Sequence, residues 1–338
     1  MSLTLVTGAN GHLGSRIVRK LLERGRRVRA LVRANSNLRG LEEQGALLPG
    51  LELVRGDMLE AASLDAALRG VDRVFHTAAV FDTRLADESV MQKANVGGTY
   101  NLIQALRAHP VERLVHTSSV AAIGYSRDPS VVLDESTWNT DPIDVYTASK
   151  TESERLVQAA VKAGLPAVVV NPATVLGPGD HKPTPSNAFI LLALSKGAPV
   201  TFNSGHTYVD ADDVAEGHLL AEEKGRVGER YVLGGSPQSN DALLADLAKR
   251  RGGRPPFVHL GHASVEVLGW AVELKAKVTR SKPLFTRAKA HKLIDYYGYF
   301  SHAKAASELG YSPRPLPEVL DRAVAWYRSQ GWLATPAS

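Results

Sequence analysis

Residues 3–24 read LTLVTGANGHLGSRIVRKLLER, and this stretch decides the fold of the first half of the chain. Leu3–Val6 is a short apolar strand, and Ser15–Arg24 has apolar residues at helical spacing. The segment between them contains three glycines. A strand, a glycine loop and a helix in this order predict the first unit of a dinucleotide-binding α/β fold.

Each glycine of the loop has a predicted role. Gly8 would form the tight turn, Gly11 would let the backbone approach a pyrophosphate, and Gly14 would let the helix pack closely on the sheet. The pyrophosphate would lie at the helix N-terminus, beside His12 and Leu13, because free N–H groups and the helix dipole favour an anion there. A turn without a ligand is the alternative, but three glycines would be costly in a merely structural loop.

The alternation of strand and helix continues along the chain. Further apolar strands are predicted at Val28–Val32, Leu51–Arg55, Arg73–Thr77, Leu114–Thr117 and Ala167–Val170. This pattern predicts an α/β Rossmann fold, a doubly wound parallel sheet with helices on both faces. We expect residues 1–170 to form the dinucleotide-binding domain, with the catalytic residues included. Residues 171–334, rich in proline and glycine at first, would form a smaller, mostly helical substrate-binding region, from which some segments return to the sheet.

Composition narrows the possible functions. The 338 residues are 44% apolar and 22% charged, with a formal net charge of +5 and no cysteine. Disulfides, thiolate catalysis and thiolate metal sites are therefore excluded. Basic residues are spread along the chain and balanced by acids, which argues against nucleic acid as a partner. No signal peptide or spanning apolar run is visible, so we expect a cytoplasmic protein that does not enter a membrane. We predict no metal site, because His181 and His206 lack partners at metal-ligand spacing.

The end of the second strand bears on the choice of cofactor. NAD-binding folds usually place an acid there to bind the ribose hydroxyls, whereas an arginine suits the 2′-phosphate of NADP. Residues 26–40 read RRVRALVRANSNLRG, with Arg33 at this position and Arg39 able to reach the same phosphate. We therefore predict NADP(H) rather than NAD(H), with solvated arginines as the alternative. In RGDM, Asp57 would bond to the adenine and Met58 would lie against its ring, or Asp57 would simply cap the next helix.

A second motif supplies acid–base chemistry. Tyr146 and Lys150, in YTASK, lie one helical turn apart on the same face. A tyrosine has an ordinary pKa of about 10, and a neighbouring ammonium group would bring it closer to a working pH. Ser119, in TSSVAAIG, follows a predicted strand and could donate a hydrogen bond to a substrate carbonyl. Its neighbour Ser118 could take the same role.

Taken together, the motifs resemble those of a known family. In chain order they are TGANGHLG, HTAAVFD, ANVGGT, TSSVAAIG, YTASK and NPATVLGPGD. The chain looks like an extended short-chain dehydrogenase/reductase, the group that contains sugar-nucleotide epimerases and dihydroflavonol-reductase-like enzymes. It also resembles hopanoid-associated sugar-epimerase-like proteins. The resemblance implies that Tyr146 donates a proton to a carbonyl, that Lys150 assists it and binds the nicotinamide ribose, and that Ser119 polarises the substrate.

The resemblance also assigns residues around the nicotinamide. Asn95, in ANVGGT, would support the catalytic site, although a buried structural amide is an equal alternative. Ala78 and Ala79 would line the nicotinamide side. Asn171 and Pro172 would approach the carboxamide.

Three reactions compete for this constellation. The first is NADPH-dependent reduction of a ketone or aldehyde to an alcohol, with a small carbonyl or alcohol compound as partner. The second is epimerisation of a sugar nucleotide with a tightly held NAD(P), and the third is dinucleotide sensing without catalysis. Val120 and Ala121 stand where a dehydratase would carry an acid pair, and Arg33 and Asn171 favour the reductase over the epimerase. The substrate itself is left open, and the resemblance allows a homodimer.

Aromatic side chains are candidates for the walls of a substrate pocket, with ordinary core packing as the alternative. They are Phe81, Trp138, Phe189, Trp270 and the aromatic residues of the run Tyr296–Phe300.

Overall fold

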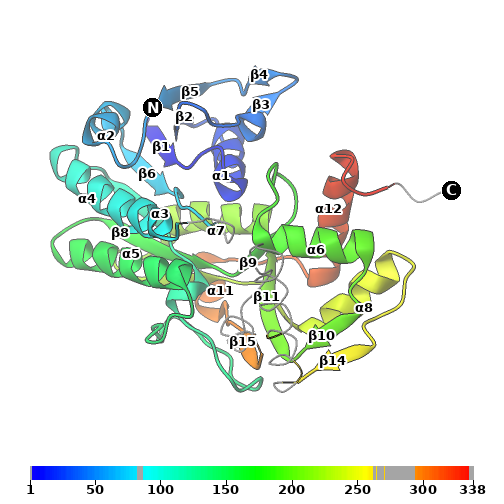
Figure 1. Ribbon diagram of the computed structural model, residues 1–338. Coiled ribbons are helices and arrows are strands. Elements are labelled where there is room, and N and C mark those ends of the chain that lie inside the picture. The colour runs from blue at the N-terminus through cyan, green and yellow to red at the C-terminus, as the bar shows by residue number, and fades with distance from the viewer. Residues whose placement is uncertain (1, 82–86, 262–263, 265–269, 271–293, 335–338) are drawn as a thin grey trace.

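The computed structural model describes residues 2–81, 87–261, 264, 270 and 294–334. Its centre is a seven-stranded sheet in the order β12-β8-β7-β6-β1-β2-β5, in which every neighbouring pair is parallel (Figure 1). The strands are β1 (Leu3–Thr7), β2 (Arg27–Val32), β5 (Leu51–Arg55), β6 (Arg73–His76), β7 (Arg113–Thr117), β8 (Ala167–Pro172) and β12 (Arg230–Leu233). The predicted doubly wound Rossmann fold is confirmed.

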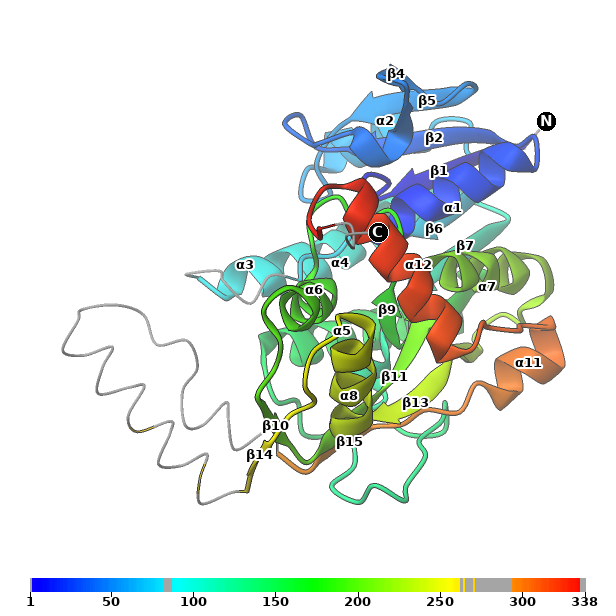
Figure 2. The same cartoon turned by 90° about the vertical axis from the view of Figure 1, so that its right-hand side faces the viewer.

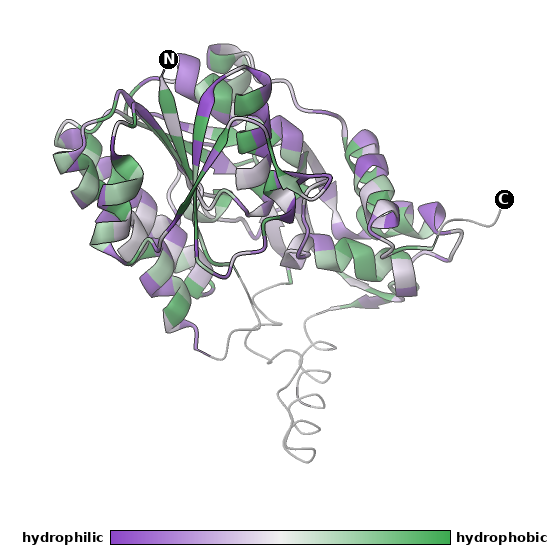
Figure 3. Cartoon of the chain, turned by 90° about the horizontal axis from the view of Figure 1, so that it is seen from above, coloured by the Kyte–Doolittle hydropathy of each residue, from purple (hydrophilic) through white to green (hydrophobic). Residues whose placement is uncertain are grey.

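Helices cover both faces of this sheet. On one face lie α1 (His12–Glu23) and α7 (Ala211–Lys224); on the other lie α2 (Ala61–Leu68), α4 (Gly98–Ala108) and α5 (Val145–Lys162). Alternate residues of each strand face opposite layers: Val115 joins the core with α1 and α7, whereas Leu114 joins the core with α4 and α5. The flanking helices carry hydrophobic and hydrophilic segments side by side (Figure 3). Each helix therefore buries one face against the sheet.

Shorter elements occupy the connections. They are η1 (Arg39–Leu41), β3 (Glu42–Glu43), β4 (Ala46–Leu47), α3 (Ser89–Gln92), the single π-helical turn η2 (Lys93–Gly97) and η3 (Val120–Ala122). Because η2 runs directly into α4, the local geometry changes within one continuous helical stretch. Such π turns are frequent at functional sites.

The second half of the chain combines the expected helices with a sheet that the sequence pattern did not reveal. The helices are α6 (Pro185–Lys196), α8 (Asn240–Arg250), α11 (Ala303–Leu309) and α12 (Leu316–Ser329). A four-stranded sheet joins β13 (Ser236–Ser239), β11 (Ser204–Asp210), β15 (Tyr296–Gly298) and β9 (Thr174–Leu176), and β10 (Val200–Phe202) pairs with β14 (Val258–Leu260). A separate apolar core holds α6, α8 and α12 against β9 and β11 (Figure 2).

One strand from the second half of the chain lies in the Rossmann sheet. The segment GERYVLGG contains β12, which pairs in parallel with β8, so that Val232 lies opposite Asn171. Within the described residues, we find no helix with both the length and the apolar character required to cross a membrane.

Candidate active site

The sheet order brings the predicted site residues to one edge. β8, β7, β6 and β1 are neighbours in the sheet, and parallel strands end at the same edge. The glycine loop follows β1, Ala78 follows β6, and Ser119 follows β7. Ligands of open α/β sheets bind at this edge, where the strand order reverses.

The three glycines differ in what surrounds them. Gly8 has a φ of +65°, and a Cβ there would lie 2.6 Å from the Cα of Ala78. A Cβ on Gly14 would overlap the carbonyl oxygen of Gly8. A Cβ on Gly11 would meet only that same oxygen, at 3.2 Å. Packing therefore requires glycine at positions 8 and 14, whereas a Cβ on Gly11 would make a single tight contact, with the Gly8 carbonyl oxygen.

The N-terminus of α1 suits an anion. Its N-cap, Gly11, offers no side-chain cap, and the first turn contains no acid. The backbone N–H groups of His12 and Leu13 are therefore not occupied by a capping side chain. The His12 ring points the other way, where its Nε2 donates to the carbonyl of Pro178 at 3.1 Å. Its side chain thus fastens the loop after β9 to the glycine loop.

The two predicted phosphate-binding arginines are exposed. Within the described part of the chain, neither Arg33 nor Arg39 has a carboxylate partner, whereas Arg29 pairs with Glu52 at 2.8 Å. The backbone around Arg33 is fixed, since Arg55 donates to its carbonyl oxygen at 3.0 Å. An unpaired cation directly after β2, at Arg33, would attract an added phosphate, and Arg39 supplies a second one farther along the chain, in η1.

The predicted adenine contacts have local roles of their own. One carboxylate oxygen of Asp57 accepts the backbone N–H of Leu59 at 2.9 Å, in the turn that leads to α2. Asp57 thus stabilises the turn before the helix, although the N-cap itself is Glu60. Met58 is half-buried against the core beneath α2 and α4.

Lys150 and Tyr146 lie on the first turns of α5. Asp144 caps this helix through a reciprocal pair of bonds with Thr147, which fixes where the helix begins. The Lys150 ammonium is buried and donates to the carbonyl of Thr117 at 2.7 Å. Burial lowers the pKa of Lys150 to about 8, against the opposing charge of Glu154.

The Tyr146 hydroxyl is protonated at neutral pH. Burial raises its pKa to about 12, a hydrogen bond with Ser119 works in the opposite direction, and the charge of Asp144 adds to the rise. Its ring lies 4.3 Å from the ring of Phe81, measured between centroids. Phe81 is 38% exposed, so part of its side chain can be reached from solvent.

The two candidate serines face different partners. Ser119, at the N-terminal end of η3, lies beside Tyr146 and also accepts the N–H of Ala121 at 3.2 Å. The buried Ser118 donates instead to the carboxylate of Glu154. The geometry therefore favours Ser119 as the hydroxyl that could reach a substrate.

Asn95 connects the site to its support. Its side chain bonds to both the N–H and the carbonyl of Val80, at 2.7 and 3.1 Å, and donates to Ser149 at 2.9 Å. It therefore holds the loop after β6 against the helix of Lys150. The amide is almost fully buried, so the geometry fits a structural amide as well as a residue that supports the catalytic site.

A buried chain of hydrogen bonds runs from Asn95 to the glycine loop. The Asn95 carbonyl accepts the hydroxyl of Thr99 at 2.7 Å, so Thr99 must accept from Nε2 of His76 at 3.1 Å. The other His76 nitrogen, Nδ1, is then an acceptor for Thr7 at 2.8 Å. Burial lowers the pKa of His76 to about 3, which agrees with this neutral form. The direction of every bond is thereby fixed.

The remaining predicted contacts are divided between buried and exposed positions. Ala78 is half-buried and donates its N–H to Thr7 at 3.3 Å, and Ala79 is exposed. Asn171 and Pro172 are buried in β8. The Asn171 amide donates to the carbonyl of Ser119 at 3.0 Å, so its side chain supports the serine loop from behind.

The predicted pocket aromatics do not form one wall. Phe81 reaches Tyr146, whereas Trp138 packs against Arg230, with 4.0 Å between the guanidinium and the ring centroid. Tyr296 stacks at 4.1 Å on Tyr125, a partly buried residue close to Tyr146. Phe189 and Trp270 are exposed.

Comparison with known proteins identifies the family. The model of the NAD dependent epimerase/dehydratase family matches residues 4–234. The chain belongs to this family. A putative dihydroflavonol 4-reductase of Synechocystis is 34% identical over 98% of this chain and 96% of its own length. The crystal structure of gox2253 has a TM-score of 0.86 and 38% identity, over 99% of this chain and 100% of that one. A dTDP-glucose 4,6-dehydratase of Streptomyces venezuelae, DesIV, solved with NAD and TYD, has a TM-score of 0.78 and 29% identity, over 98% of each chain.

These matches confirm the resemblance to extended short-chain dehydrogenases/reductases. The chain therefore belongs to a family of enzymes that use a nicotinamide dinucleotide, and its relatives include a protein named as a reductase. Sequence analysis overlooked Glu154 and Arg230, which are buried behind Ser118. Spacing could have indicated Glu154, because it follows Lys150 by one turn on the same face of the helix.

Proposed function

We propose that this protein reduces a ketone or aldehyde to an alcohol with NADPH, with Tyr146 as the proton donor. The observation that carries the proposal is the placement of Ser119, Tyr146 and Lys150 at the sheet edge that also holds the glycine loop. A binding protein without catalysis would have no need of this arrangement. Residues 1–170 would bind the dinucleotide and residues 171–334 would mainly bind the substrate.

The dinucleotide fits the residues present. The glycine backbone at Gly11 and the uncapped start of α1 would accept the pyrophosphate, and Lys150 would hold the nicotinamide ribose. Arg33 and Arg39 favour NADP(H), because a 2′-phosphate would give both unpaired guanidinium groups a partner. When bound, the reduced nicotinamide supplies the hydride.

The chain supplies the proton and the charge stabilisation. Tyr146 is protonated below its pKa of about 12 and can give its proton to the carbonyl oxygen as that oxygen gains negative charge. The Ser119 hydroxyl would donate a hydrogen bond to the same oxygen. The ammonium of Lys150, one turn along the helix, would stabilise the phenolate that remains. One hydride and one proton convert the carbonyl into the alcohol.

A sugar-nucleotide epimerase is the second candidate, favoured by the match to the NAD dependent epimerase/dehydratase family. The residues after Ser119 weigh against a dehydratase, because Val120 and Ala121 are buried and apolar where an acid pair would stand. An epimerase would hold its dinucleotide through every turnover, whereas a reductase must exchange it.

The test is to follow NADPH absorbance with purified protein and a panel of ketones, aldehydes and flavonoid-like carbonyls. We expect consumption that Tyr146→Phe reduces by about 10²-fold or more. Tyr125→Phe is the matched control, since it removes a buried phenol beside the site and should leave turnover nearly unchanged. No consumption of NADPH, together with a dinucleotide that survives purification, would transfer the assignment to the epimerase.

A further inference from the structure

A buried carboxylate lies directly behind the proposed catalytic residues. Glu154 is fully buried in α5, one turn after Lys150. Its Oε2 accepts hydrogen bonds from Ser118 and, at 2.7 Å, from Asn171, and its Oε1 accepts from Nε of Arg230. All three partners donate, so the group acts only as an acceptor, as an ionised carboxylate does.

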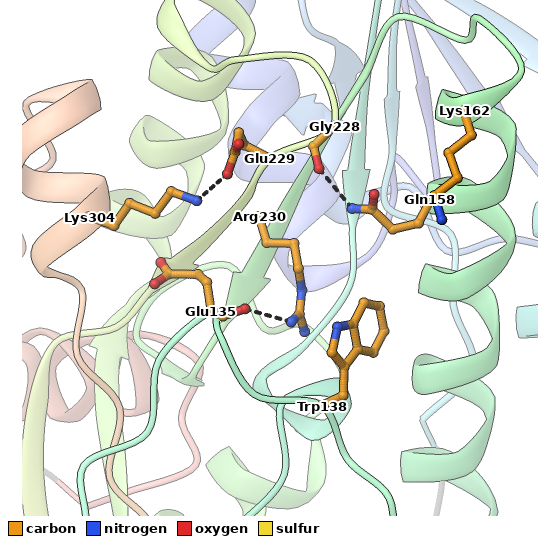
Figure 4. Close-up of a pocket in the computed structure, with 8 residues that line it drawn as sticks. All are labelled: Glu135, Trp138, Gln158, Lys162, Gly228, Glu229, Arg230 and Lys304. Carbon is orange, nitrogen blue, oxygen red and sulfur yellow. Dashed lines mark hydrogen bonds and ion pairs between the residues drawn. The ribbon is translucent and has the colours of Figure 1, made fainter.

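Arg230 is held on its outer side as well. Its Nη1 donates to the carbonyls of Glu135 and Thr137, at 2.8 and 2.7 Å, and its guanidinium lies over the ring of Trp138 (Figure 4). These groups lie at a small pocket of about 260 Å³ beside α5. Arg230 is thus held by two backbone carbonyls, by the Trp138 ring and by the Glu154 carboxylate, and it has little freedom to move away from Glu154.

The same carboxylate reaches the serine segment by two routes. Ser118 bonds to it directly, and Asn171 uses its amide nitrogen both for Glu154 and, at 3.0 Å, for the carbonyl of Ser119. The backbone of Ser119 is therefore held by a side chain that is itself bonded to Glu154. A shift of Glu154 would move the hydroxyl that the proposed reaction needs.

We infer that Glu154, held by Arg230, is a positioning residue: it fixes the Ser118–Ser119 segment and places a negative charge one helical turn from Lys150. This inference rests on the proposed function for its role in turnover. Glu154 would touch neither substrate nor cofactor. A buried ion pair is a weak source of stability, so a purely structural purpose does not explain its position behind the site.

The charge should be visible in the titration of Lys150. The charged and titratable groups that act on its ammonium are Glu154 on α5, His76 on β6 and His116 on β7, and Arg230 on β12 faces Glu154. Burial lowers the pKa of His76 to about 3 and that of His116 well below its ordinary range, so both stay neutral above neutral pH. Loss of the Glu154 charge should therefore make Lys150 lose its proton at a lower pH.

The experiment measures NADPH affinity by fluorescence between about pH 7 and about pH 10, in a Tyr146→Phe background that removes the tyrosine titration. In this parent, affinity should fall as Lys150 deprotonates near its pKa of about 8. Adding Glu154→Gln should move the fall to lower pH. In the wild-type background, the same substitution should lower kcat roughly 10- to 100-fold through displacement of Ser119.

Glu222→Gln is the matched control. Glu222 is equally buried and pairs with Arg26 and Arg73, but it lies on α7 and contacts no proposed site residue. It should lower the melting temperature without moving the NADPH profile. If Glu154→Gln fails to fold, Glu154→Gln/Arg230→Met removes both charges together and should show a shift in the same direction but smaller, because loss of the Arg230 cation partly offsets loss of the carboxylate.

A midpoint unchanged by Glu154→Gln, or a flat profile in the parent, would overturn the inference. The titration needs no carbonyl substrate, so it does not depend on the reaction. If Glu154→Gln shifts the midpoint of the NADPH-affinity profile but the wild type consumes no NADPH with any carbonyl, only the proposed reductase activity would be overturned.

Discussion

The ammonium of Lys150 bonds to the carbonyl of Thr117, two residues before Ser119, at 2.7 Å. The end of β7 thus holds the lysine and presents the serine, while α5 presents the tyrosine. Lys150, Ser119 and Tyr146 are thus positioned relative to the backbone of residues 117–119. Such rigidity is what a proton transfer requires, because a misplacement of about 1 Å can cost about 10²-fold in rate.

The two serines should respond differently to loss of their hydroxyls. Ser119→Ala should lower turnover by about 10²-fold or more, the scale expected for one lost donor to a developing oxyanion. Ser118→Ala should mainly lower stability, by about 1–3 kcal/mol, because it leaves part of the Glu154 carboxylate unpaired. Steady-state kinetics and urea unfolding of both variants separate these effects. Equal turnover in the two variants would contradict the assignment of the catalytic hydroxyl to Ser119 rather than to Ser118.

Substitutions in the glycine loop should separate effects on folding stability from effects on NADPH binding. Gly11→Ala should change the free energy of unfolding by no more than about 1 kcal/mol, since its Cβ would make one tight contact, at 3.2 Å from the Gly8 carbonyl oxygen, yet it should weaken NADPH binding by about tenfold or more. Gly14→Ala should destabilise the fold by about 1–3 kcal/mol, because its Cβ overlaps the Gly8 carbonyl. Thermal unfolding and fluorescence titration provide the two measurements. Unchanged NADPH affinity in Gly11→Ala would place the pyrophosphate elsewhere.

The two exposed arginines should set the preference between dinucleotides. Arg33→Ala and Arg39→Ala should each weaken NADPH binding by about 10- to 100-fold and leave NADH nearly unaffected. Arg27→Ala is the control, since Arg27 is also exposed on β2 but lies at the opposite end of the strand. Equal wild-type affinity for NADPH and NADH would contradict the NADP(H) assignment.

Buried histidines should make the fold sensitive to acid. Burial lowers the pKa of His76 to about 3 and those of His206 and His218 to about 4. Below about pH 6.5 these histidines are protonated in the unfolded chain but remain neutral in the folded chain. The free energy of unfolding therefore decreases as the pH is lowered, by up to about 1.4 kcal/mol per pH unit for each histidine.

Urea unfolding at about pH 7 and about pH 5.5 measures this slope. His76→Gln should reduce the difference between the two pH values, whereas His259→Gln, at an exposed position, should not. The same slope in wild type and His76→Gln would show that another group is responsible.

The sequence was most informative where its pattern was regular. The strands at Leu3–Thr7 and Ala167–Pro172 lie within a residue or two of their predicted positions, because both are apolar runs next to clear helical spacing. Ser236–Ser239 escaped prediction. It reads SPQS, with neither alternation nor β-branched residues, and is a strand only because β11 pairs with it.

The candidate site shows a similar division. Local spacing places Tyr146, Lys150 and Glu154 on one helix face, but it cannot supply Arg230, which arrives from β12 after 76 residues. Nor could it choose between Ser118 and Ser119. Adjacent residues of extended chain point in opposite directions, and only the tertiary structure shows which of the two faces Tyr146.

The late return of β12 has a consequence for synthesis on the ribosome. β8 is buried along its whole length and reads AVVVNP, and one of its two edges is covered only when residues 230–233 have been made. Until then the nascent chain carries an open, apolar strand edge, which is a template for pairing with other chains. Truncation before residue 230 should therefore yield an aggregating product rather than an independent dinucleotide-binding domain.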